Sequence, residues 1–284
     1  MVCNLNCNSC PLAYLCIPAV IASLIAIKKI SKLQKKRMLS QISFLLISNF
    51  SFIFGATGLI YSYFYCWEAP LALAACPIGV VEHAFADRTF YILIYLIGAI
   101  FTVSIIIGRG ACGWACPVGF LQDLIRGRKI KRKDKKIRYA KYIILISIPL
   151  ACFFTGKLAY TDICPIGGLT GTLPRLIINP KGYTFTVFFY PKMLFVAGFF
   201  ILIIFIARGW CRYLCPVGAM MACFNKISFL QIKYNEEKCI KCFRCSQVCP
   251  MQIEMPDENR SNECIRCGRC IDACPTNAIE FKWQ

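Results

Sequence analysis

The sequence predicts an α-helical membrane protein with four or five transmembrane helices in a duplicated arrangement, followed by a small α+β domain at the C-terminal end. Three observations lead to this fold class. The 284-residue chain is 58% hydrophobic, and its apolar residues gather in long runs separated by basic clusters, which is a membrane pattern. One cysteine-containing unit occurs twice within the apolar part. A second cysteine pattern, also doubled, fills residues 239–275.

Four apolar runs have the length and composition of membrane helices, which need about 20 residues to cross the hydrocarbon core. They lie at residues 42–64, 90–108, 139–155 and 185–207. A fifth run, residues 12–27, is short and predicts either a tilted first helix or a re-entrant segment. Pro149 falls inside the third run, where a proline is expected to kink a membrane helix and not to end it.

The basic residues of the chain are concentrated at the ends of these apolar runs. The chain has 33 Lys and Arg against 14 Asp and Glu, a formal net charge of +19. Basic residues flanking membrane helices mark the cytoplasmic side, so their location argues against nucleic acid as a partner. The pattern predicts an inner-membrane protein whose basic loops and C-terminal domain face the cytoplasm.

The chain is therefore divided into five parts. Residues 1–40 form a cysteine-rich N-terminal segment with a basic inner loop, and residues 126–141 form a second, more basic cytoplasmic loop. Residues 41–125 and 142–225 are the first and second membrane repeats. Residues 235–284 form the C-terminal domain.

The C-terminal domain contains the run C-x2-C-x2-C-x3-C-P twice. In this spacing three cysteines ligate one [4Fe-4S] cluster and the fourth ligates its neighbour, so the domain is expected to be a bacterial-type 2[4Fe-4S] ferredoxin. One predicted ligand set is Cys239, Cys242, Cys245 and Cys274, and the other is Cys264, Cys267, Cys270 and Cys249. Zinc sites also use paired C-x2-C units, but they do not require this doubled run.

The membrane part carries the duplicated unit. Residues 107–120 (IGRGACGWACPVGF) and 206–219 (IARGWCRYLCPVGA) share Arg-Gly, two cysteines and Pro-Val-Gly at the same offsets. Cysteines four residues apart lie on one face of a helix, which predicts that Cys112, Cys116, Cys211 and Cys215 are membrane cluster ligands. Pro117 and Pro216 would redirect the chain after each pair. Arg109 and Arg208 would either offset thiolate charge or snorkel to the inner interface.

A C-P-I-G tetrapeptide precedes each unit, at Cys76 and Cys164, in segments expected on the outer side. Three interpretations stay open for these cysteines. They could form disulfides, as outer faces permit. They could bind a further cluster with two ligands from Cys3, Cys7 and Cys10. Alternatively, Cys76 could join Cys112 and Cys116 while Cys164 joins the other pair, if the C-P-I-G segments are re-entrant.

Other reactive residues carry weaker signals. Cys152 is expected to be an ordinary buried cysteine. Cys223 is expected to be spare, with a role as a backup ligand as the alternative, and no role is assigned to Cys16 or Cys66. His83 is the only histidine, which excludes a bis-histidine haem within this chain. It is expected to be an interfacial polar residue rather than a quinone ligand.

These motifs together resemble the membrane polyferredoxins of the NapH/NosR/CcoG type, over about residues 42–284. The resemblance rests on the two C-x3-C-P pairs and the eight ferredoxin cysteines. It implies a membrane electron-transfer subunit, and the N-terminal cysteines and the C-P-I-G pair exceed the family signature.

The expected function is the relay of single electrons through several [4Fe-4S] clusters, two in the ferredoxin domain and one or two at the membrane motifs. The chain is expected to be a non-catalytic subunit of an oxidoreductase complex. Its expected partners are the bilayer and a redox protein, with a quinone as a further candidate. The alternatives are a quinol dehydrogenase in its own right and an accessory or maturation factor that supplies electrons to a metalloenzyme.

Overall fold

The computed structural model describes residues 31–49, 60, 63, 65–66, 69, 72–73, 76–125, 136–158, 160–178, 187–255, 258 and 260–283. Predictions about Cys3, Cys7, Cys10 and Cys16, the apolar run 12–27 and most of the loop 126–141 lie outside these residues.

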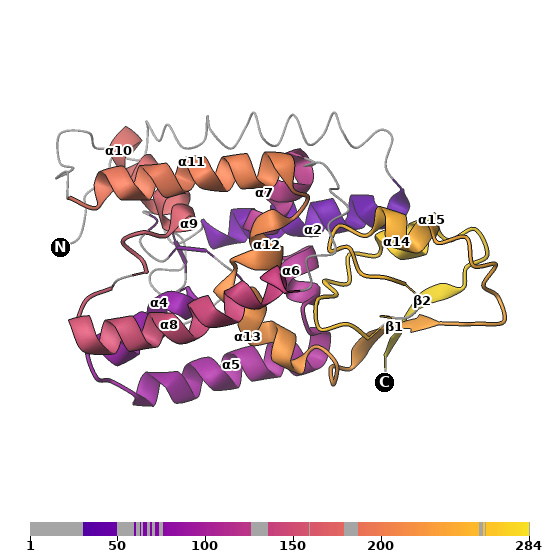
Figure 1. Ribbon diagram of the computed structural model, residues 1–284, viewed down its shortest axis with the longest axis horizontal. Helices are drawn as coiled ribbons and strands as arrows, with labels where there is room; N and C mark the ends of the chain where they lie inside the picture. The colour runs from indigo at the N-terminus through magenta and orange to yellow at the C-terminus, as the bar shows by residue number, and fades with distance from the viewer. Residues whose placement is uncertain are drawn as a thin grey trace.

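Four long helices have roughly parallel axes (Figure 1). They are α2 (Lys32–Ser48), α5 (Tyr91–Ile107), α8 (Ala140–Thr155) and α11 (Phe189–Phe205). The last three coincide with the apolar runs predicted at 90–108, 139–155 and 185–207, and Pro149 lies inside α8. Helices α5 and α11 are strongly apolar, with Lys192 of α11 as their one charged residue, and each packs through only a few buried residues.

Helix α2 differs from the prediction. Its first residue is Lys32, so the basic residues expected in an inner loop form the first turns of a helix that ends at Ser48. Ser31 caps it by accepting a hydrogen bond from the amide of Gln34, as serine commonly does at this position. Arg37 lies in this helix and is almost fully buried.

The long helices surround several short ones. Near one end lie α4 (Pro77–Ala86), α9 (Pro165–Gly167), the π-helical turn η3 (Gly168–Thr172) and α10 (Leu173–Ile178). Closer to the C-terminal domain lie α6 (Gly110–Trp114), α7 (Pro117–Ile125), α12 (Gly209–Tyr213) and α13 (Pro216–Phe224). A 3₁₀ turn, η2 (Ile137–Tyr139), leads into α8. Every short helix that follows a cysteine-proline step begins at the proline, whose fixed φ suits the first helical turn.

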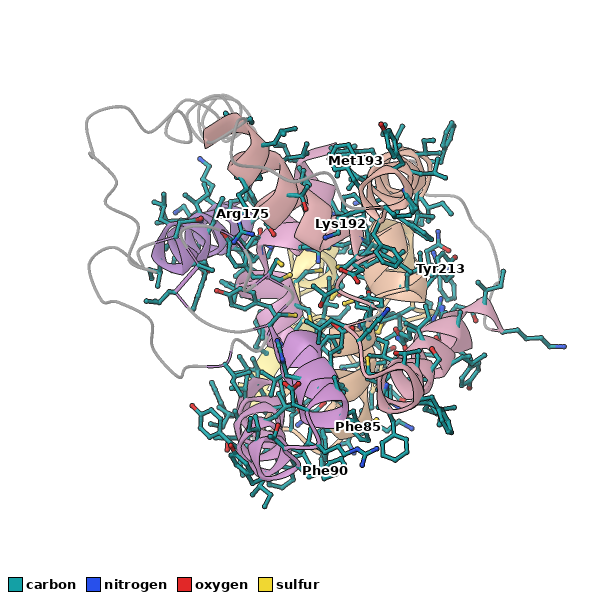
Figure 2. All side chains as sticks on the ribbon, turned by 90° about the vertical axis from the view of Figure 1, so that its left-hand side faces the viewer. Phe85, Phe90, Arg175, Lys192, Met193 and Tyr213 are labelled. Atoms are coloured by element: carbon teal, nitrogen blue, oxygen red, sulfur yellow. The ribbon has the colours of Figure 1, made fainter. Side chains whose placement is uncertain are left out.

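Figure 2 views the molecule from the end opposite the C-terminal domain, with the long helices around the short ones. Phe85 and Phe90 meet edge to face where α4 leads into α5, with ring centroids 5.4 Å apart. Large apolar side chains cover the outward faces of the long helices; Ile94 on α5, Phe154 on α8 and Tyr190 on α11 are each more than 70% exposed.

Residues 137–155 form one described helix that is long and apolar enough to cross a membrane, with a mean hydropathy of 1.6. The apolar helices α5 and α11 are shorter, at 17 residues each.

The C-terminal domain contains a two-stranded antiparallel sheet, β1 (Leu230–Tyr234) and β2 (Ile279–Trp283), with Ile232 opposite Phe281. Two short helices, α14 (Arg244–Val248) and α15 (Arg269–Ala273), pack together beside it. The buried core runs without a break from the long helices into this domain. The short helices of the two C-x3-C-P units lie among the long helices on the side nearer to the C-terminal domain, and α4 and α9, which follow the C-P-I-G cysteines, lie farther from it (Figure 1).

Candidate iron–sulfur sites

Two cavities in the C-terminal domain are each lined by four cysteines. The first, of about 400 Å³, contains the side chains of Cys239, Cys242, Cys245 and Cys274. The second, of about 420 Å³, contains those of Cys249, Cys264, Cys267 and Cys270. Each cavity takes three cysteines from one C-x2-C-x2-C-x3-C-P run and the fourth from the other, which is the crossed arrangement of two-cluster ferredoxins.

The backbone around both cavities repeats itself. Lys241 and Phe243, on either side of Cys242, have φ of 51° and 53°, and Arg266 and Gly268, on either side of Cys267, have 49° and 73°. Successive residues of opposite handedness turn amide groups toward a common point and favour an anion there. A non-glycine residue adopts this conformation only at a cost, so its repetition indicates a constraint shared by both sites.

Amide groups also reach the cysteine sulfurs directly. The amide of Lys241 donates to Cys239 Sγ at 3.3 Å, that of Ala278 to Cys274 Sγ at 3.3 Å, and that of Ile253 to Cys249 Sγ at 3.5 Å. Such bonds stabilise thiolates and help set the reduction potential of a cluster. The residues present therefore fit a pair of [4Fe-4S] clusters.

The four cysteines of the membrane repeats form a third group. All four are buried, and Cys112, Cys116 and Cys215 each lie within electrostatic range of Cys211. The amide of Gly218 donates to Cys215 Sγ at 3.3 Å, and Gln122 Nε2 lies 3.1 Å from Cys211 Sγ. The structure thus brings the two C-x3-C-P pairs to one place.

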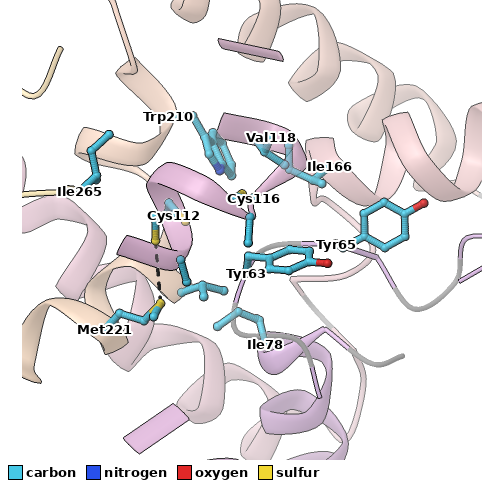
Figure 3. Packing of buried hydrophobic residues seen from close by; sticks show 14 of the residues in the cluster. Tyr63, Tyr65, Ile78, Cys112, Cys116, Val118, Ile166, Trp210, Met221 and Ile265 are labelled. Atoms are coloured by element: carbon cyan, nitrogen blue, oxygen red, sulfur yellow. Dashed lines mark hydrogen bonds between the residues drawn. The ribbon is translucent and has the colours of Figure 1, made fainter. Parts of the chain in front are cut away.

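The local geometry of each pair differs from the predicted single helical face. Helix α6 ends at Trp114, and Cys116 stands immediately before the proline that opens α7. The second repeat does the same, with Cys215 capping α13. A helix thus ends between the two cysteines of each pair: the first cysteine lies in a short helix, and the second lies immediately before the next helix. Figure 3 shows Cys112 directed toward Met221, with 3.8 Å between the sulfurs, and Cys116 lying among apolar side chains that include Trp210.

Arg109 and Arg208 join the two repeats reciprocally. Arg109 Nη2 donates to the carbonyl of Cys211 at 3.3 Å, and Arg208 Nη1 donates to that of Cys112 at 3.2 Å. Each arginine thus donates a hydrogen bond to the backbone carbonyl of the first cysteine in the other repeat. Their exposed fractions are 0% and 1%, so the interpretation that they snorkel to the interface is wrong.

The C-terminal domain contacts the membrane repeats at the second cavity. The carbonyl of Ile265 comes so close to Gly113 in α6 that a Cβ there would lie 2.2 Å from it. Trp114 Nε1 donates to the carbonyl of Arg266 at 2.9 Å, and Arg266 Nη1 donates to the carbonyl of Ile107 at 2.5 Å. The loop between Cys264 and Cys267 therefore rests directly on the helix of the first C-x3-C-P pair.

Two buried carboxylates fix this contact. Glu263 accepts from Arg109 at 2.7 Å and from Lys141 at 2.5 Å. Asp123 pairs with Arg208, with Arg37 at 2.5 Å and with Arg269 at 3.0 Å. Burial alone would raise the pKa of Asp123, but the three guanidinium groups outweigh burial and lower it to about 2.

A further cavity, of about 280 Å³, lies away from the ferredoxin domain and is lined by Cys66, Cys76 and Cys164. The two C-P-I-G cysteines thus share one cavity. Among the residues that the structure describes, neither of them lines a common cavity with the C-x3-C-P pair of its own repeat. Cys66 lines the shared cavity as well, although the sequence assigned this cysteine no role because it belongs to no repeated motif. No disulfide joins the cysteines in the described part of the chain.

His83 lies at the exposed end of α4, with Nδ1 3.1 Å from Asp87 Oδ2. The neighbouring Glu82 is fully buried and accepts hydrogen bonds from the amides of Tyr160 and Thr161, at 2.6 Å and 3.1 Å. Glu82 therefore anchors the segment that leads to Cys164.

Within the residues the structure describes, no three Cys, His, Asp or Glu side chains converge as ligands of a single metal ion. The cysteines are instead arranged around cavities. This combination of a crossed two-cluster domain and a buried four-cysteine group defines an iron–sulfur electron-transfer protein of the polyferredoxin class.

Comparison with known proteins gives the family. The family described as a 4Fe-4S binding domain matches residues 89–136 and 188–234, and two further families with the same description match residues 231–253 and 260–280. The chain belongs to the NapH/NosR-type polyferredoxins and binds [4Fe-4S] clusters.

Three relatives illustrate the similarity. An uncharacterised protein of Methanocaldococcus jannaschii is 32% identical over 73% of this chain and 86% of its own length. The methylamine utilization ferredoxin-type protein MauN of Methylorubrum extorquens is 31% identical over 63% of this chain and 56% of its own. The ferredoxin-type protein NapH of Haemophilus influenzae is 29% identical over 75% and 73%. No solved structure matches this chain.

Proposed function

We propose that this protein is a multi-pass subunit of the inner membrane that relays single electrons between a membrane quinone or partner subunit and a redox protein. Its ferredoxin domain faces the cytoplasm. The ligand sets are the two crossed ferredoxin groups and the four cysteines of the C-x3-C-P pairs. When bound, the clusters supply one-electron chemistry at thiolate-ligated iron.

The observation that carries this proposal is the contact between the second ferredoxin cavity and α6. Ile265 lies between two cysteines of that cavity, and its carbonyl meets the backbone of Gly113, the residue after Cys112. Electron tunnelling falls steeply with distance, so backbone contact between consecutive sites favours transfer through the protein.

The protein's own residues would hold each site and set its charge. Amide groups donate to the cysteine sulfurs, and Arg109 and Arg208 place buried positive charge beside the four-cysteine group. Nearby positive charge favours the reduced state of a cluster, because reduction adds a negative charge. The apolar surroundings keep water away from the thiolates.

The multi-pass arrangement rests on α5, α8 and α11. Their outward faces carry large apolar side chains, which a bilayer solvates better than water does. α5 and α11 are short for a full crossing, but helices of about this length are accommodated by local thinning of the bilayer.

The test is iron content and EPR spectroscopy of the purified, anaerobically handled protein and its Cys116→Ser and Cys215→Ser variants. Each variant is expected to lose about four iron atoms per chain, the content of one cubane cluster, and to keep both ferredoxin signals. Cys223→Ser is the matched control, because Cys223 is exposed and its thiol lies at the carbonyl of Ala219. Unchanged iron in both test variants would contradict a membrane cluster at these cysteines.

A further inference from the structure

The cavity lined by Cys66, Cys76 and Cys164 has no part in the relay proposed above. Its three cysteines come from distant places in the chain: one from each C-P-I-G tetrapeptide and one from the segment before α4. All three are no more than 7% exposed. Three buried thiols around one cavity are an unusual arrangement unless they form disulfides or ligate a metal centre.

The backbone at this cavity repeats that of the four-cysteine group. The amide of Gly167 donates to Cys164 Sγ at 3.5 Å, and the amide of Gly218 donates to Cys215 Sγ at 3.3 Å. Both bonds run from the glycine to the cysteine of a Cys-Pro-x-Gly step. Cys76 likewise caps a helix that opens with proline. The sulfurs of Cys76 and Cys164 therefore stand at the start of a proline-initiated helix, as Cys215 Sγ does in the four-cysteine group.

Gly167 lies beside the third cysteine of the cavity. A Cβ added there would lie 3.4 Å from Cys66 Sγ, in ordinary van der Waals contact, so Cys66 packs directly against the C-P-I-G backbone. The neighbouring carboxylate of Glu82 is occupied by the amides of Tyr160 and Thr161 and a hydroxyl, so it is held at the cavity's edge and does not enter it.

The cavity is also close to the four-cysteine group. Tyr160 lines it and lies within electrostatic range of Cys76, Cys164 and Cys215. Ile78 and Ile166, from the two C-P-I-G steps, belong to the same packed cluster as Cys116 (Figure 3).

We propose that Cys66, Cys76 and Cys164 bind a further [4Fe-4S] cluster through three of its iron atoms, with the fourth iron ligated from outside this cavity. In the step that it performs, the cluster of the four-cysteine group is oxidised by one electron and this cluster is reduced by one electron. No bond to a substrate breaks and no proton is required. The proposal rests on the relay described above and extends it toward the end of the molecule opposite the ferredoxin domain.

The first test uses the unaltered full-length protein. The relay alone requires three clusters, or about 12 iron atoms per chain, whereas the added site raises this to about 16, with an equal amount of acid-labile sulfide. A well-loaded preparation with about 12 iron atoms would overturn the proposal and leave the relay intact.

The second test compares Cys66→Ser with Cys152→Ser. Cys152 is also fully buried, in α8 beside Glu82, but does not line the cavity. Cys66→Ser is expected to lose about four iron atoms and one EPR signal while the ferredoxin signals persist, and Cys152→Ser is expected to lose none. The inference fails if Cys66→Ser keeps every signal while Cys116→Ser still loses one. If Cys116→Ser keeps its iron as well, the relay itself fails.

Discussion

The glycine that follows each C-x3-C-P pair is explained by an arginine from the other repeat. A Cβ on Gly119 would lie 2.6 Å from Arg208 Nη1 and 2.8 Å from the carbonyl of Cys112, and a Cβ on Gly218 would lie 3.1 Å from Arg109 Nη2. The repeat was visible in the sequence because Arg-Gly, Cys and Gly recur at fixed offsets. The exchange of arginines between the repeats was not visible, because a sequence pattern does not tell which arginine contacts which backbone carbonyl.

Gly119→Ala is expected to destabilise the protein by about 1–3 kcal/mol, because the added methyl group displaces both a guanidinium and a backbone carbonyl. Gly218→Ala should cost less, since its Cβ meets only the end of the Arg109 side chain at less than 3.4 Å. The measurement is the thermal unfolding midpoint in detergent, with Gly198→Ala as control because nothing lies within 4 Å of its added Cβ. If Gly119→Ala and Gly198→Ala lowered the unfolding midpoint equally, the contact with Arg208 would not be the cause.

At the level of elements, Asp123 ties four segments together. It belongs to α7 and pairs with Arg37 of α2, with Arg269 of α15 and with Arg208, which precedes α12. This explains the difference between the predicted and the observed α2. The sequence suggested an exposed basic loop, but Arg37 is buried against a carboxylate 86 residues away. Helices α5, α8 and α11 could be predicted because their apolar runs depend on no distant partner.

Asp123→Asn is expected to cost about 3–5 kcal/mol near pH 7, because it leaves buried guanidinium groups without their counter-charge. The folded-state pKa of about 2 lies below the value of about 3.9 for an unperturbed aspartate. The ionised carboxylate therefore adds stability above about pH 4, and this contribution is lost as the pH falls toward 2.

The measurement is the urea unfolding midpoint of wild type and Asp123→Asn between pH 3 and 7. The difference between them should stay constant from pH 7 to about 5 and begin to narrow below about 4. Asp272→Asn, on the α15 surface where its carboxylate bonds Ser31, serves as the control. A difference that grows on acidification would contradict the ion-pair explanation.

At the scale of the whole molecule, the cysteine groups form a series. The two ferredoxin cavities share crossed ligands, the second rests on α6, and the four-cysteine group lies near the cavity of Cys66. The spacing within each motif predicted which cysteines belong together in the ferredoxin domain. It could not assign Cys66 to a ligand set, because a lone cysteine has no spacing to interpret.

The orientation of this series can be tested in membrane vesicles. A C-terminal tag beside β2 is expected to be cleaved by protease in inverted inner-membrane vesicles and protected in spheroplasts, because the positions of the basic residues in the sequence predict a cytoplasmic ferredoxin domain. A cytoplasmic and a periplasmic marker protein provide the controls. Cleavage in spheroplasts alone would reverse the proposed orientation.

The exchange of arginines between the two repeats also bears on how such a chain could arise. One repeat by itself has two of the four thiols and an arginine that reaches for a carbonyl it does not contain. A single ancestral copy could have completed this site only by forming a homodimer. Gene fusion would then have made permanent a partnership that began between separate molecules.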